Sequence, residues 1–242
     1  LIVTCDTGVC VIDRANSLTR TPFIYASSAA SYGDGSHGFD GDWSLEALRS
    51  LKPMNLYGWS KHLFDLALVD RWMKKEKMPP HWVWLKFFNV YGPNEYHKGH
   101  MASVLAKVFD LAKSGQPVKL FKSHRDGVAD GDQRRDFIYV DDAVSVLRWL
   151  LEATGINGIF NVGTGKAERF RDMIGAMFKA LGKPANIEYV DMPPAIRGQY
   201  QYFTEARVER LRRAGFNAGF TPLEASVGQY VTGYLNRDDR YR

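Results

Sequence analysis

Tyr57 and Lys61 stand four positions apart at the start of a stretch whose periodicity predicts a helix over residues 57 to about 78. Residues at this spacing lie on one face of a helix, about one turn from each other. A phenol with an ordinary pKa of about 10 is a poor base at neutral pH, but a nearby ammonium group favours the phenolate and lowers such a pKa. The pair could therefore transfer a proton, although Tyr and Lys at this spacing also occur together by chance on surface helices.

Ser28 follows a run of β-forming residues over positions 23–26, which predicts a buried strand. The sheets of α/β proteins bind ligands at the carboxyl ends of their strands. A hydroxyl at such a strand end could donate a hydrogen bond to a hydroxyl or carbonyl group of a substrate. Taken alone, Ser28 could equally do no more than end the strand.

The elements that must position these side chains alternate along the chain. Short runs rich in β-branched and aromatic residues predict strands at 23–26, 82–85, 118–121, 159–162 and 187–190. Helical patterns run over residues 57 to about 78, 101–114, 142–153 and 169–181. Strands that alternate with helices imply crossover units and a mainly parallel sheet, so the sequence predicts an α/β protein.

Two helix details are also predicted. In the first helix, apolar residues recur at steps of three and four and predict one buried face, made of Leu56, Leu63, Phe64, Ala67, Leu68 and Trp72. Thr221 and Glu224 have the spacing of a capping box and predict a last helix that runs through Tyr234. Pro and Gly interrupt the last third of the chain, which predicts a smaller, more irregular subdomain there.

Composition limits the class of protein. The chain has 242 residues, and 32 Lys and Arg against 27 Asp and Glu give a net charge of +5. Its 45% hydrophobic and 24% charged residues are ordinary for a globular protein. The apolar runs are much shorter than the roughly 20 residues that a membrane span needs. Because the basic residues are scattered, they argue against nucleic acid as a partner and favour a phosphorylated small molecule.

The first residues of the chain bear on its compartment. Asp6 and Asp13 interrupt the apolar N-terminal stretch, so no secretory signal is expected. Cys5 and Cys10 have no further cysteines with which to complete a metal quartet. We therefore expect a reduced, cytoplasmic protein that uses no metal.

Further motifs accompany the triad of Ser28, Tyr57 and Lys61, in which the serine comes about thirty residues before the tyrosine. Phe-Asn-Val-Tyr-Gly-Pro begins at Phe88, and segments 134–142, 158–165 and 198–204 carry further motifs. Together these residues resemble the extended short-chain dehydrogenase/reductase family of nucleotide-sugar epimerases and dehydratases. The resemblance extends from about residue 22 to residue 236. The stretch 97–103, His-Lys-Gly-His-Met-Ala-Ser, is similar to members that act on an ADP-linked heptose for lipopolysaccharide synthesis.

The resemblance implies a fold. It is a Rossmann-like doubly wound parallel sheet, truncated at its N-terminal side, with a smaller C-terminal α/β substrate-binding subdomain. Residues 21–165 would be the remainder of the dinucleotide-binding domain, with substrate segments at about 93–135. Residues 166–242 would form mainly the subdomain, whereas residues 1–20 do not resemble the family and are left unassigned.

The resemblance also implies roles for single residues. Tyr57, Lys98 and Ser28 would be catalytic, with Tyr57 and Lys98 each serving one orientation of the substrate. Lys61, Val90 and Tyr57 would contact the cofactor. The substrate would contact a larger set: Ser28, Asn89, His100, Lys107, Leu120, Phe121, Lys122, Ser123, Arg135 and Tyr200. At the positions of His100 and Lys107, the family commonly has Ser and His.

Three of these residues have plainer interpretations. Lys98 could be a solvated loop cation. Arg135 could form a surface ion pair with Asp136, and Tyr200 could be an ordinary aromatic residue of the subdomain.

The implied activity is epimerisation of an ADP-heptose by transient oxidation and reduction with bound NADP, or with NAD, in a homo-oligomer. The chain does not open with the strand, Gly-x-Gly-x-x-Gly turn and helix that bind the pyrophosphate in such a domain. We therefore expect that it begins inside the dinucleotide-binding domain and that, alone, it holds NADP poorly and turns over little substrate. The segment that selects NADP over NAD is absent too.

Two other functions stay open at this point. The first is another nucleotide-sugar epimerase or a dehydratase, although a dehydratase is expected to carry acidic residues where Ala29 and Ala30 stand. The second is a non-catalytic remnant that retains some affinity for nucleotide sugars.

Overall fold

The computed structural model describes residues 2–3, 22–153 and 155–241. They divide into two compact units, each built from three segments of the chain. Unit 1 comprises residues 1–88, 144–165 and 205–218, and unit 2 comprises residues 89–143, 166–204 and 219–242. In the described part of the chain, each helix is too short or too polar to cross a membrane.

Unit 1 contains a four-stranded parallel sheet in the order β1-β2-β3-β7. Its strands are β1 (Ile2–Val3), β2 (Phe23–Ser28), β3 (Trp82–Phe87) and β7 (Gly158–Val162). In the register of the sheet, Ile24 lies opposite Val83, and Leu85 lies opposite Phe160. Strands β2, β3 and β7 are mainly apolar and buried, as expected for a parallel sheet covered on both faces. The predicted α/β class is confirmed.

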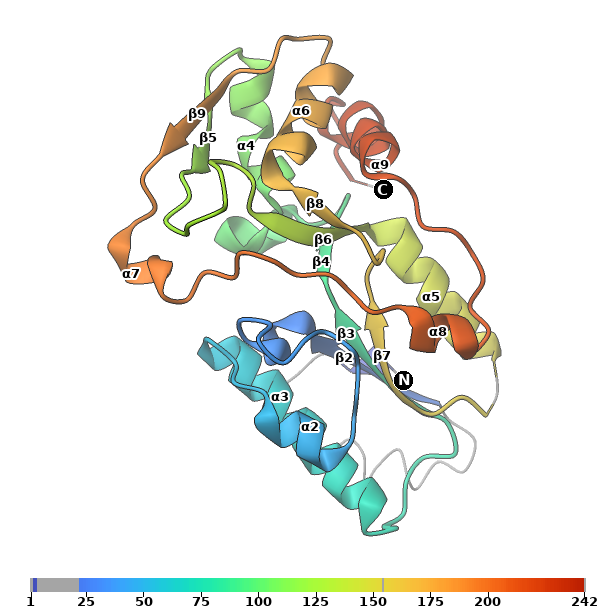
Figure 1. Ribbon diagram of the computed structural model, residues 1–242. Helices are drawn as coiled ribbons and strands as arrows, with labels where there is room; N and C mark the ends of the chain where they lie inside the picture. The colour runs from blue at the N-terminus through green and yellow to red at the C-terminus, as the bar shows by residue number, and fades with distance from the viewer. Residues whose placement is uncertain (1, 4–21, 154, 242) are drawn as a thin grey trace. The chain divides into compact units, whose positions relative to one another are not determined.

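The helices of unit 1 pack against this sheet. Figure 1 shows α2 (Leu45–Ser50) and α3 (Leu56–Met73) side by side next to β2, with α8 (Glu209–Arg213) beside the edge strand β7. The 3₁₀ turn η1 (Ala29–Tyr32) follows β2 directly and contacts α3. Aromatic side chains dominate the core, including Phe23, Trp82 and Trp84.

The buried face of α3 differs from the predicted one. Leu56, Leu63 and Trp72 are 89%, 58% and 45% exposed, respectively, and of the predicted face only Leu68 is fully buried. The residues that α3 does bury still follow a helical period: Gly58, Lys61, His62, Asp65, Leu68 and Val69. A hydrophobic pattern misses this face because half of its members are polar. The helix also ends at Met73 rather than near residue 78.

Unit 2 contains two small sheets. The first has the order β4-β6-β8, where β4 (Asn89–Tyr91) is parallel and β8 (Ala167–Arg169) antiparallel to β6 (Arg134–Tyr139). The second pairs β5 (Val118–Phe121) with β9 (Ile187–Val190) in parallel. All five predicted strands are therefore present, whereas β1, β4, β6 and β8 were not predicted.

Helices form much of the core of unit 2. Figure 1 shows α4 (Val104–Lys113) beside α6 (Phe170–Ala180), and α9 (Leu223–Tyr230) also packs on α6. Shorter elements complete the unit: η2 (Tyr96–Met101), α7 (Pro194–Arg197) and the π-helical turn η3 (Val231–Leu235). Phe109, Met177 and Tyr230 are fully buried among these helices.

Two predicted boundaries differ from the structure. Residues 205–218 belong to unit 1, where Ala206 and Val208 pack on its core and Arg210 donates to the carbonyl oxygen of Gly41 at 3.0 Å. Helix α5 (Val140–Glu152), predicted over 142–153, begins in unit 2 and continues in unit 1. The domain limits drawn from the sequence missed this interleaving because nothing in composition marks it.

The capping box predicted at Thr221 and Glu224 was wrong. Pro222 precedes α9, and among the described residues no side chain caps that helix. Thr221 instead donates to the carboxylate of Asp142 from its backbone nitrogen, at 2.8 Å, and from its hydroxyl, at 3.0 Å. Glu224 forms an ion pair with Lys179.

Candidate functional site

Ser28 lies at the carboxyl end of β2, where it caps the turn η1. Its Oγ accepts a hydrogen bond from the backbone nitrogen of Ala30 at 3.1 Å. The hydroxyl hydrogen can therefore still be donated, because this contact uses only a lone pair of the oxygen. The side chain is half-buried, so it is held in place and yet can contact a ligand.

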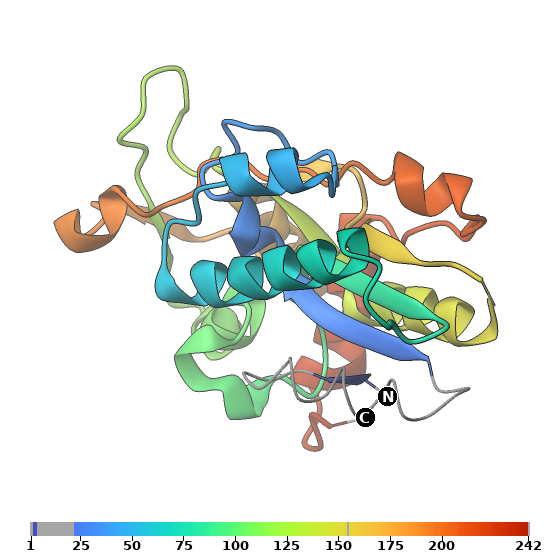
Figure 2. The same ribbon diagram turned by 90° about the horizontal axis from the view of Figure 1, so that it is seen from below.

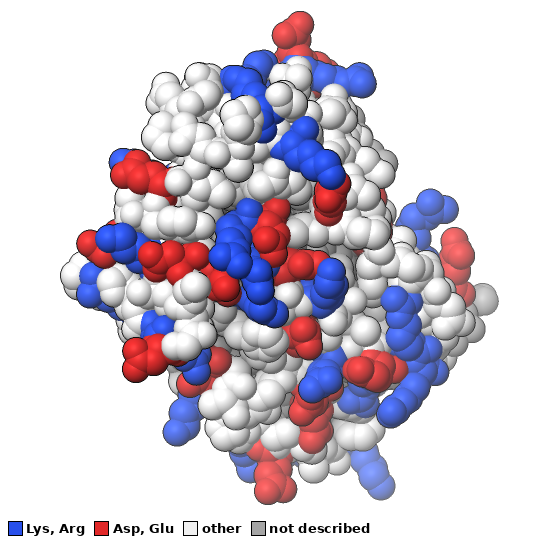
Figure 3. Space-filling view, turned by 45° about the horizontal axis from the view of Figure 1, so that its top comes forward, with Lys and Arg blue, Asp and Glu red and all other residues white. Residues whose placement is uncertain are grey.

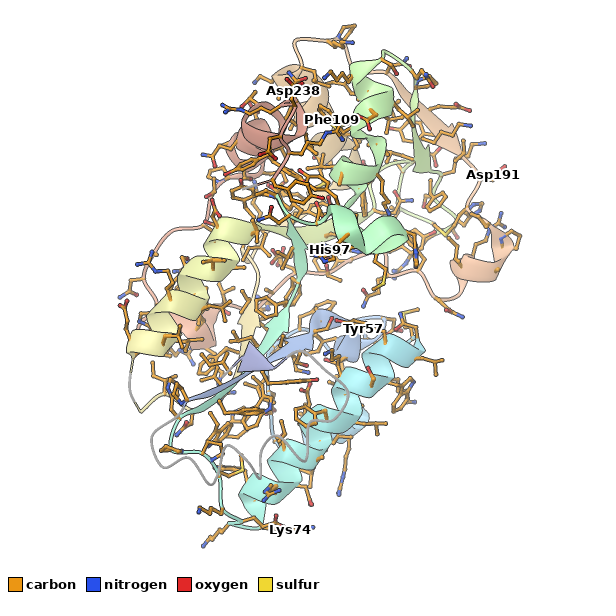
Figure 4. The ribbon with its side chains drawn as sticks, turned by 180° about the vertical axis from the view of Figure 1, so that it is seen from behind. Tyr57, Lys74, His97, Phe109, Asp191 and Asp238 are labelled. Atoms are coloured by element: carbon orange, nitrogen blue, oxygen red, sulfur yellow. The ribbon has the colours of Figure 1, made fainter. Side chains whose placement is uncertain are left out.

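Tyr57 lies in the first turn of α3. The helix begins after Asn55, whose side chain accepts from the backbone nitrogen of Gly58 at 2.8 Å. A Cβ atom at Gly58 would lie 2.6 Å from the carbonyl oxygen of Ala30, so only glycine lets the helix start pack this closely on the turn after Ser28. Figure 4 shows Tyr57 at this end of α3 and Lys74 at the other end. The Tyr57 side chain is 49% exposed.

Lys61 is a buried cation without a carboxylate partner in the described part of the chain. It is 8% exposed, and its Nζ lies 5.1 Å from the ring centroid of Tyr25 and 5.8 Å from that of Tyr57. A buried ammonium group is unfavourable unless polar atoms surround it. Ribose hydroxyls of a dinucleotide would supply such atoms, so the residues present fit a nicotinamide cofactor here.

A second group of predicted residues lines a pocket of about 260 Å³ within unit 2. Asn89 and Val90 from β4 line it together with Lys98 from η2 and Lys107 from α4. His100 is not among the lining residues, but its carbonyl oxygen accepts from Nζ of Lys107 at 3.4 Å. Besides the carboxylate of Glu95, the pocket therefore gathers two cations and an amide, groups that suit sugar hydroxyls and phosphate oxygens.

Glu95 holds the loop that carries Lys98, a role that the sequence analysis missed. Its buried carboxylate accepts from the backbone nitrogen of Ser103 at 2.7 Å, from the Ser103 hydroxyl at 2.6 Å and from the Tyr230 hydroxyl at 3.0 Å. Burial and the charge of Glu95 raise the pKa of Tyr230, which keeps this phenol a donor. Glu95 lies between the Phe-Asn-Val-Tyr-Gly-Pro motif and the stretch 97–103, and this position is the signal in the sequence that could have indicated its role.

Arg135 is a buried guanidinium rather than a partner of a surface ion pair. It is 7% exposed and donates to the carbonyl oxygens of Arg134, at 2.9 Å, and of Gln201. Its Cζ lies 5.1 Å from the ring centroid of Tyr200. Burial lowers the pKa of Arg135, because its surroundings disfavour the charge. A bound anion would stabilise the charged guanidinium and so offset the free-energy cost of burying it.

The segment from Leu120 to Ser123 lies near Tyr200. The ring centroids of Phe121 and Tyr200 are 6.1 Å apart, and burial raises the pKa of Tyr200 while Arg135 opposes that shift.

The other residues of this segment have partners of their own. The backbone nitrogen of Ser123 donates to Asp130 at 2.7 Å. Leu120 is buried, whereas Lys122 forms an ion pair with Asp191 across 3.6 Å. Figure 2 shows the loop that follows β5 projecting near α7.

The predicted site residues therefore form two groups, one in each unit. Ser28, Tyr57 and Lys61 lie in unit 1, and the other predicted residues lie in unit 2. Cys5 and Cys10 lie outside the described residues. In Figure 3, Lys and Arg are interspersed with Asp and Glu, so this face gives no support to a nucleic-acid partner.

A parallel sheet with a strand-end serine and a Tyr-x-x-x-Lys helix defines a nicotinamide-dependent enzyme of the short-chain dehydrogenase/reductase class. The chain belongs to the NAD dependent epimerase/dehydratase family, whose model matches residues 5–163. The match takes in most of the N-terminal stretch that the sequence analysis left outside the resemblance.

The curated relatives agree on one enzyme. ADP-L-glycero-D-manno-heptose-6-epimerase of Nitratidesulfovibrio vulgaris strain DP4 is 51% identical over 92% of this chain and 67% of its own length. The enzyme of that name from Fusobacterium nucleatum is 44% identical over 90% of this chain and 67% of its own. The chain thus spans about two thirds of the length of these relatives.

Solved structures agree with the fold. The Helicobacter pylori ADP-L-glycero-D-manno-heptose-6-epimerase has a TM-score of 0.71 and 26% identity, and the match covers 91% of this chain and 61% of that one. The Thermus thermophilus UDP-glucose 4-epimerase in complex with NAD has a TM-score of 0.70 and 23% identity, with coverage of 93% and 68%.

Proposed function

We propose that this chain carries the catalytic triad and substrate-binding part of an enzyme that converts ADP-D-glycero-D-manno-heptose to ADP-L-glycero-D-manno-heptose at C6. The observation that carries the proposal is the buried ammonium of Lys61 beside Tyr57, on the helix packed against the turn of Ser28. Relatives named ADP-L-glycero-D-manno-heptose-6-epimerase, at 44–51% identity, support this choice of substrate.

The chemistry must suit a carbon whose hydrogen is not acidic. A bound nicotinamide supplies a hydride acceptor and donor, so the carbon can pass through a ketone and be reduced from its other face. Tyr57 accepts the hydroxyl proton at its Oη when one epimer is oxidised, and it returns that proton when the same epimer is formed again. Ser28 donates its free hydroxyl hydrogen to the same sugar oxygen, and Lys61 binds ribose hydroxyls through Nζ.

Lys98 serves the second substrate orientation in this proposal. Reduction from the opposite face requires the sugar carbon to turn, which moves its oxygen away from the first proton donor. Lys98 lies in the unit 2 pocket, on a loop that Glu95 fixes through three hydrogen bonds. An ammonium group in a held loop can hand a proton to the turned oxygen.

Arg135 and its neighbours bind the ADP moiety in this proposal. The buried guanidinium of Arg135 offers a fork of donors suited to diphosphate oxygens, and Phe121 and Tyr200 offer aromatic surface nearby. We propose NADP as the nicotinamide cofactor on the resemblance of the motifs; the description of the family, which names NAD, supports a nicotinamide dinucleotide.

A substrate panel tests the proposal. The full-length protein is incubated with NADP and with either ADP-D-glycero-D-manno-heptose, UDP-glucose or dTDP-glucose, and products are identified by NMR. We expect C6 epimers of the ADP-heptose at a rate at least about a hundredfold above any reaction of the hexoses, because several substrate contacts differ at once. Faster epimerisation of a hexose, or loss of water from dTDP-glucose, would assign the chain to another enzyme of the family.

A further inference from the structure

A fully buried ion pair lies within unit 1, between α3 and β3. Nζ of Lys86 lies 3.0 Å from Oδ2 of Asp65, and the two side chains are 1% and 0% exposed. Asp65 is one helical turn beyond Lys61 and two turns beyond Tyr57 on the same helix. The proposed chemistry assigns no task to either residue of the pair.

The pair extends by hydrogen bonds to the turn that carries Ser28. Ser27 donates its hydroxyl to Oδ2 of Asp65 at 2.9 Å, and Lys86 donates from Nζ to the hydroxyl oxygen of Ser31 at 2.7 Å. Ser31 in turn donates to the carbonyl oxygen of Ser28 at 2.8 Å. A continuous path of buried polar contacts therefore joins α3 to the backbone of Ser28.

The network is costly as a purely stabilising device. Burying two charges incurs a desolvation penalty that apolar side chains of similar volume avoid. Oδ1 of Asp65 is also buried without a hydrogen-bond partner in the described part of the chain. The polar contacts instead fix the geometry of the elements that they join, because hydrogen bonds require particular angles and distances, whereas apolar packing tolerates a range of them.

We propose that Asp65 and Lys86 are positioning residues, which fix the turn of Ser28 against the helix that carries Tyr57 and Lys61. This inference rests on the proposed function, since it concerns the geometry of that same triad. A displacement of about 1 Å at a reacting group can lower a rate by about a hundredfold. The network therefore acts on the rate of the chemical step more than on substrate binding.

Two variants of the full-length protein separate positioning from stability. Asp65→Asn with Lys86→Met removes both charges together, so neither is left unpaired, whereas Lys86→Arg keeps the cation. We expect the double variant to fold, with kcat at least tenfold lower and KM within about twofold of the wild type, because the binding groups stay in place. Lys86→Arg alone is expected to keep most of the wild-type kcat. A folded double variant with the wild-type kcat would overturn the proposal.

A milder variant covers the case in which the double variant does not fold. Ser31→Ala removes the link to the Ser28 carbonyl and leaves the ion pair intact. Ser50→Ala is its control, since that hydroxyl donates to the nearby carbonyl of Ala47, away from the network. We expect Ser31→Ala to lower kcat severalfold and to speed amide hydrogen exchange in residues 28–33, with no change in Ser50→Ala. Exchange that stays at the wild-type rate, or that rises equally in both variants, would contradict the proposal.

The exchange measurement does not depend on the substrate. If the wild type fails to epimerise ADP-heptose, the proposed function fails, but faster exchange in residues 28–33 of Ser31→Ala would still show that the network holds the Ser28 turn.

Discussion

Nζ of Lys61 lies 5.8 Å from the ring centroid of Tyr57, and both side chains come from the first two turns of α3. Lys61 is buried, whereas half of the Tyr57 side chain is exposed. The helix therefore holds a cation beneath a phenol whose oxygen can reach a ligand. This arrangement separates binding from proton transfer, because the buried Lys61 can bind a ribose while the exposed Tyr57 can contact the sugar of the substrate.

Tyr57→Phe tests the proton-transfer role. We expect kcat for C6 epimerisation to fall by about 10²–10⁴, the usual contribution of a general acid–base group. The melting temperature should stay near that of the wild type, because the lost hydroxyl makes no hydrogen bond to the described residues. Tyr241→Phe, at another exposed tyrosine, is the control and should leave kcat unchanged. If the kcat of Tyr57→Phe stays within tenfold of the wild type, Tyr57 is excluded as the proton carrier.

Gly58→Ala tests the close packing of α3 on the Ser28 turn. The new Cβ would lie 2.6 Å from the carbonyl oxygen of Ala30, so the helix start must move. We expect lower stability by thermal unfolding and a fall in kcat of at least tenfold. Gly175→Ala in α6 is the matched control, since its Cβ meets nothing within 4 Å. There the helix should gain about 0.5–1 kcal/mol and kcat should not change. Equal behaviour of the two variants would refute the packing argument.

The helix α3 also shows what the sequence could and could not predict. Its position, the strand that ends at Ser28 and the Tyr57–Lys61 pair on the helix follow from spacing and motifs. Its buried face does not, because Lys61, His62 and Asp65 occupy positions that hydrophobicity assigns to solvent. Asp65, for example, is buried together with partners from distant segments, Ser27 and Lys86. Those partners cannot be identified without the fold.

Unit 2 shows the same limit. The sequence indicated Arg135 and Tyr200 as substrate residues but left a surface ion pair open for the arginine. Only the structure shows that Arg135 is buried against Tyr200. Strand β6, which carries Arg135, was not predicted because its charged beginning lacks an apolar run, although residues 136–139 are buried.

Arg135→Lys tests the diphosphate contact. Lysine keeps the charge but loses the planar fork that can bind two oxygens at once. We expect KM for the ADP-heptose to rise about tenfold or more while kcat changes little, because the reacting carbon keeps its contacts. Steady-state kinetics separates the two constants. Arg134→Lys, at the exposed neighbouring position, should leave KM unchanged. A fall in kcat with constant KM would place Arg135 in the chemistry instead.

His62 predicts a pH dependence of stability. Burial, and then the charge of Lys86, lower the pKa of His62 from 6.5, and its Nδ1 is buried without a hydrogen-bond partner in the described part of the chain. Because the unfolded chain takes up the proton first, the stabilising contribution is complete above pH 6.5 and is lost as the pH falls below it.

Denaturant unfolding at several pH values between 5 and 8 gives the free energy of unfolding and so measures this effect. His62→Gln, which stays neutral, should flatten the loss of stability on the acid side, whereas His37→Gln at an exposed histidine should not. If His62→Gln keeps the wild-type slope, the buried imidazole does not control acid stability.

The most direct test of the account follows the hydrogen at C6. ADP-D-glycero-D-manno-heptose labelled with deuterium at C6 is incubated in ordinary water with the full-length protein and its nicotinamide cofactor, and the L-glycero product is examined by NMR. Transient oxidation by the Tyr57 and Lys61 site returns the same hydride, so we predict that the product keeps its deuterium at C6. Replacement of that deuterium by solvent hydrogen during epimerisation would contradict the mechanism.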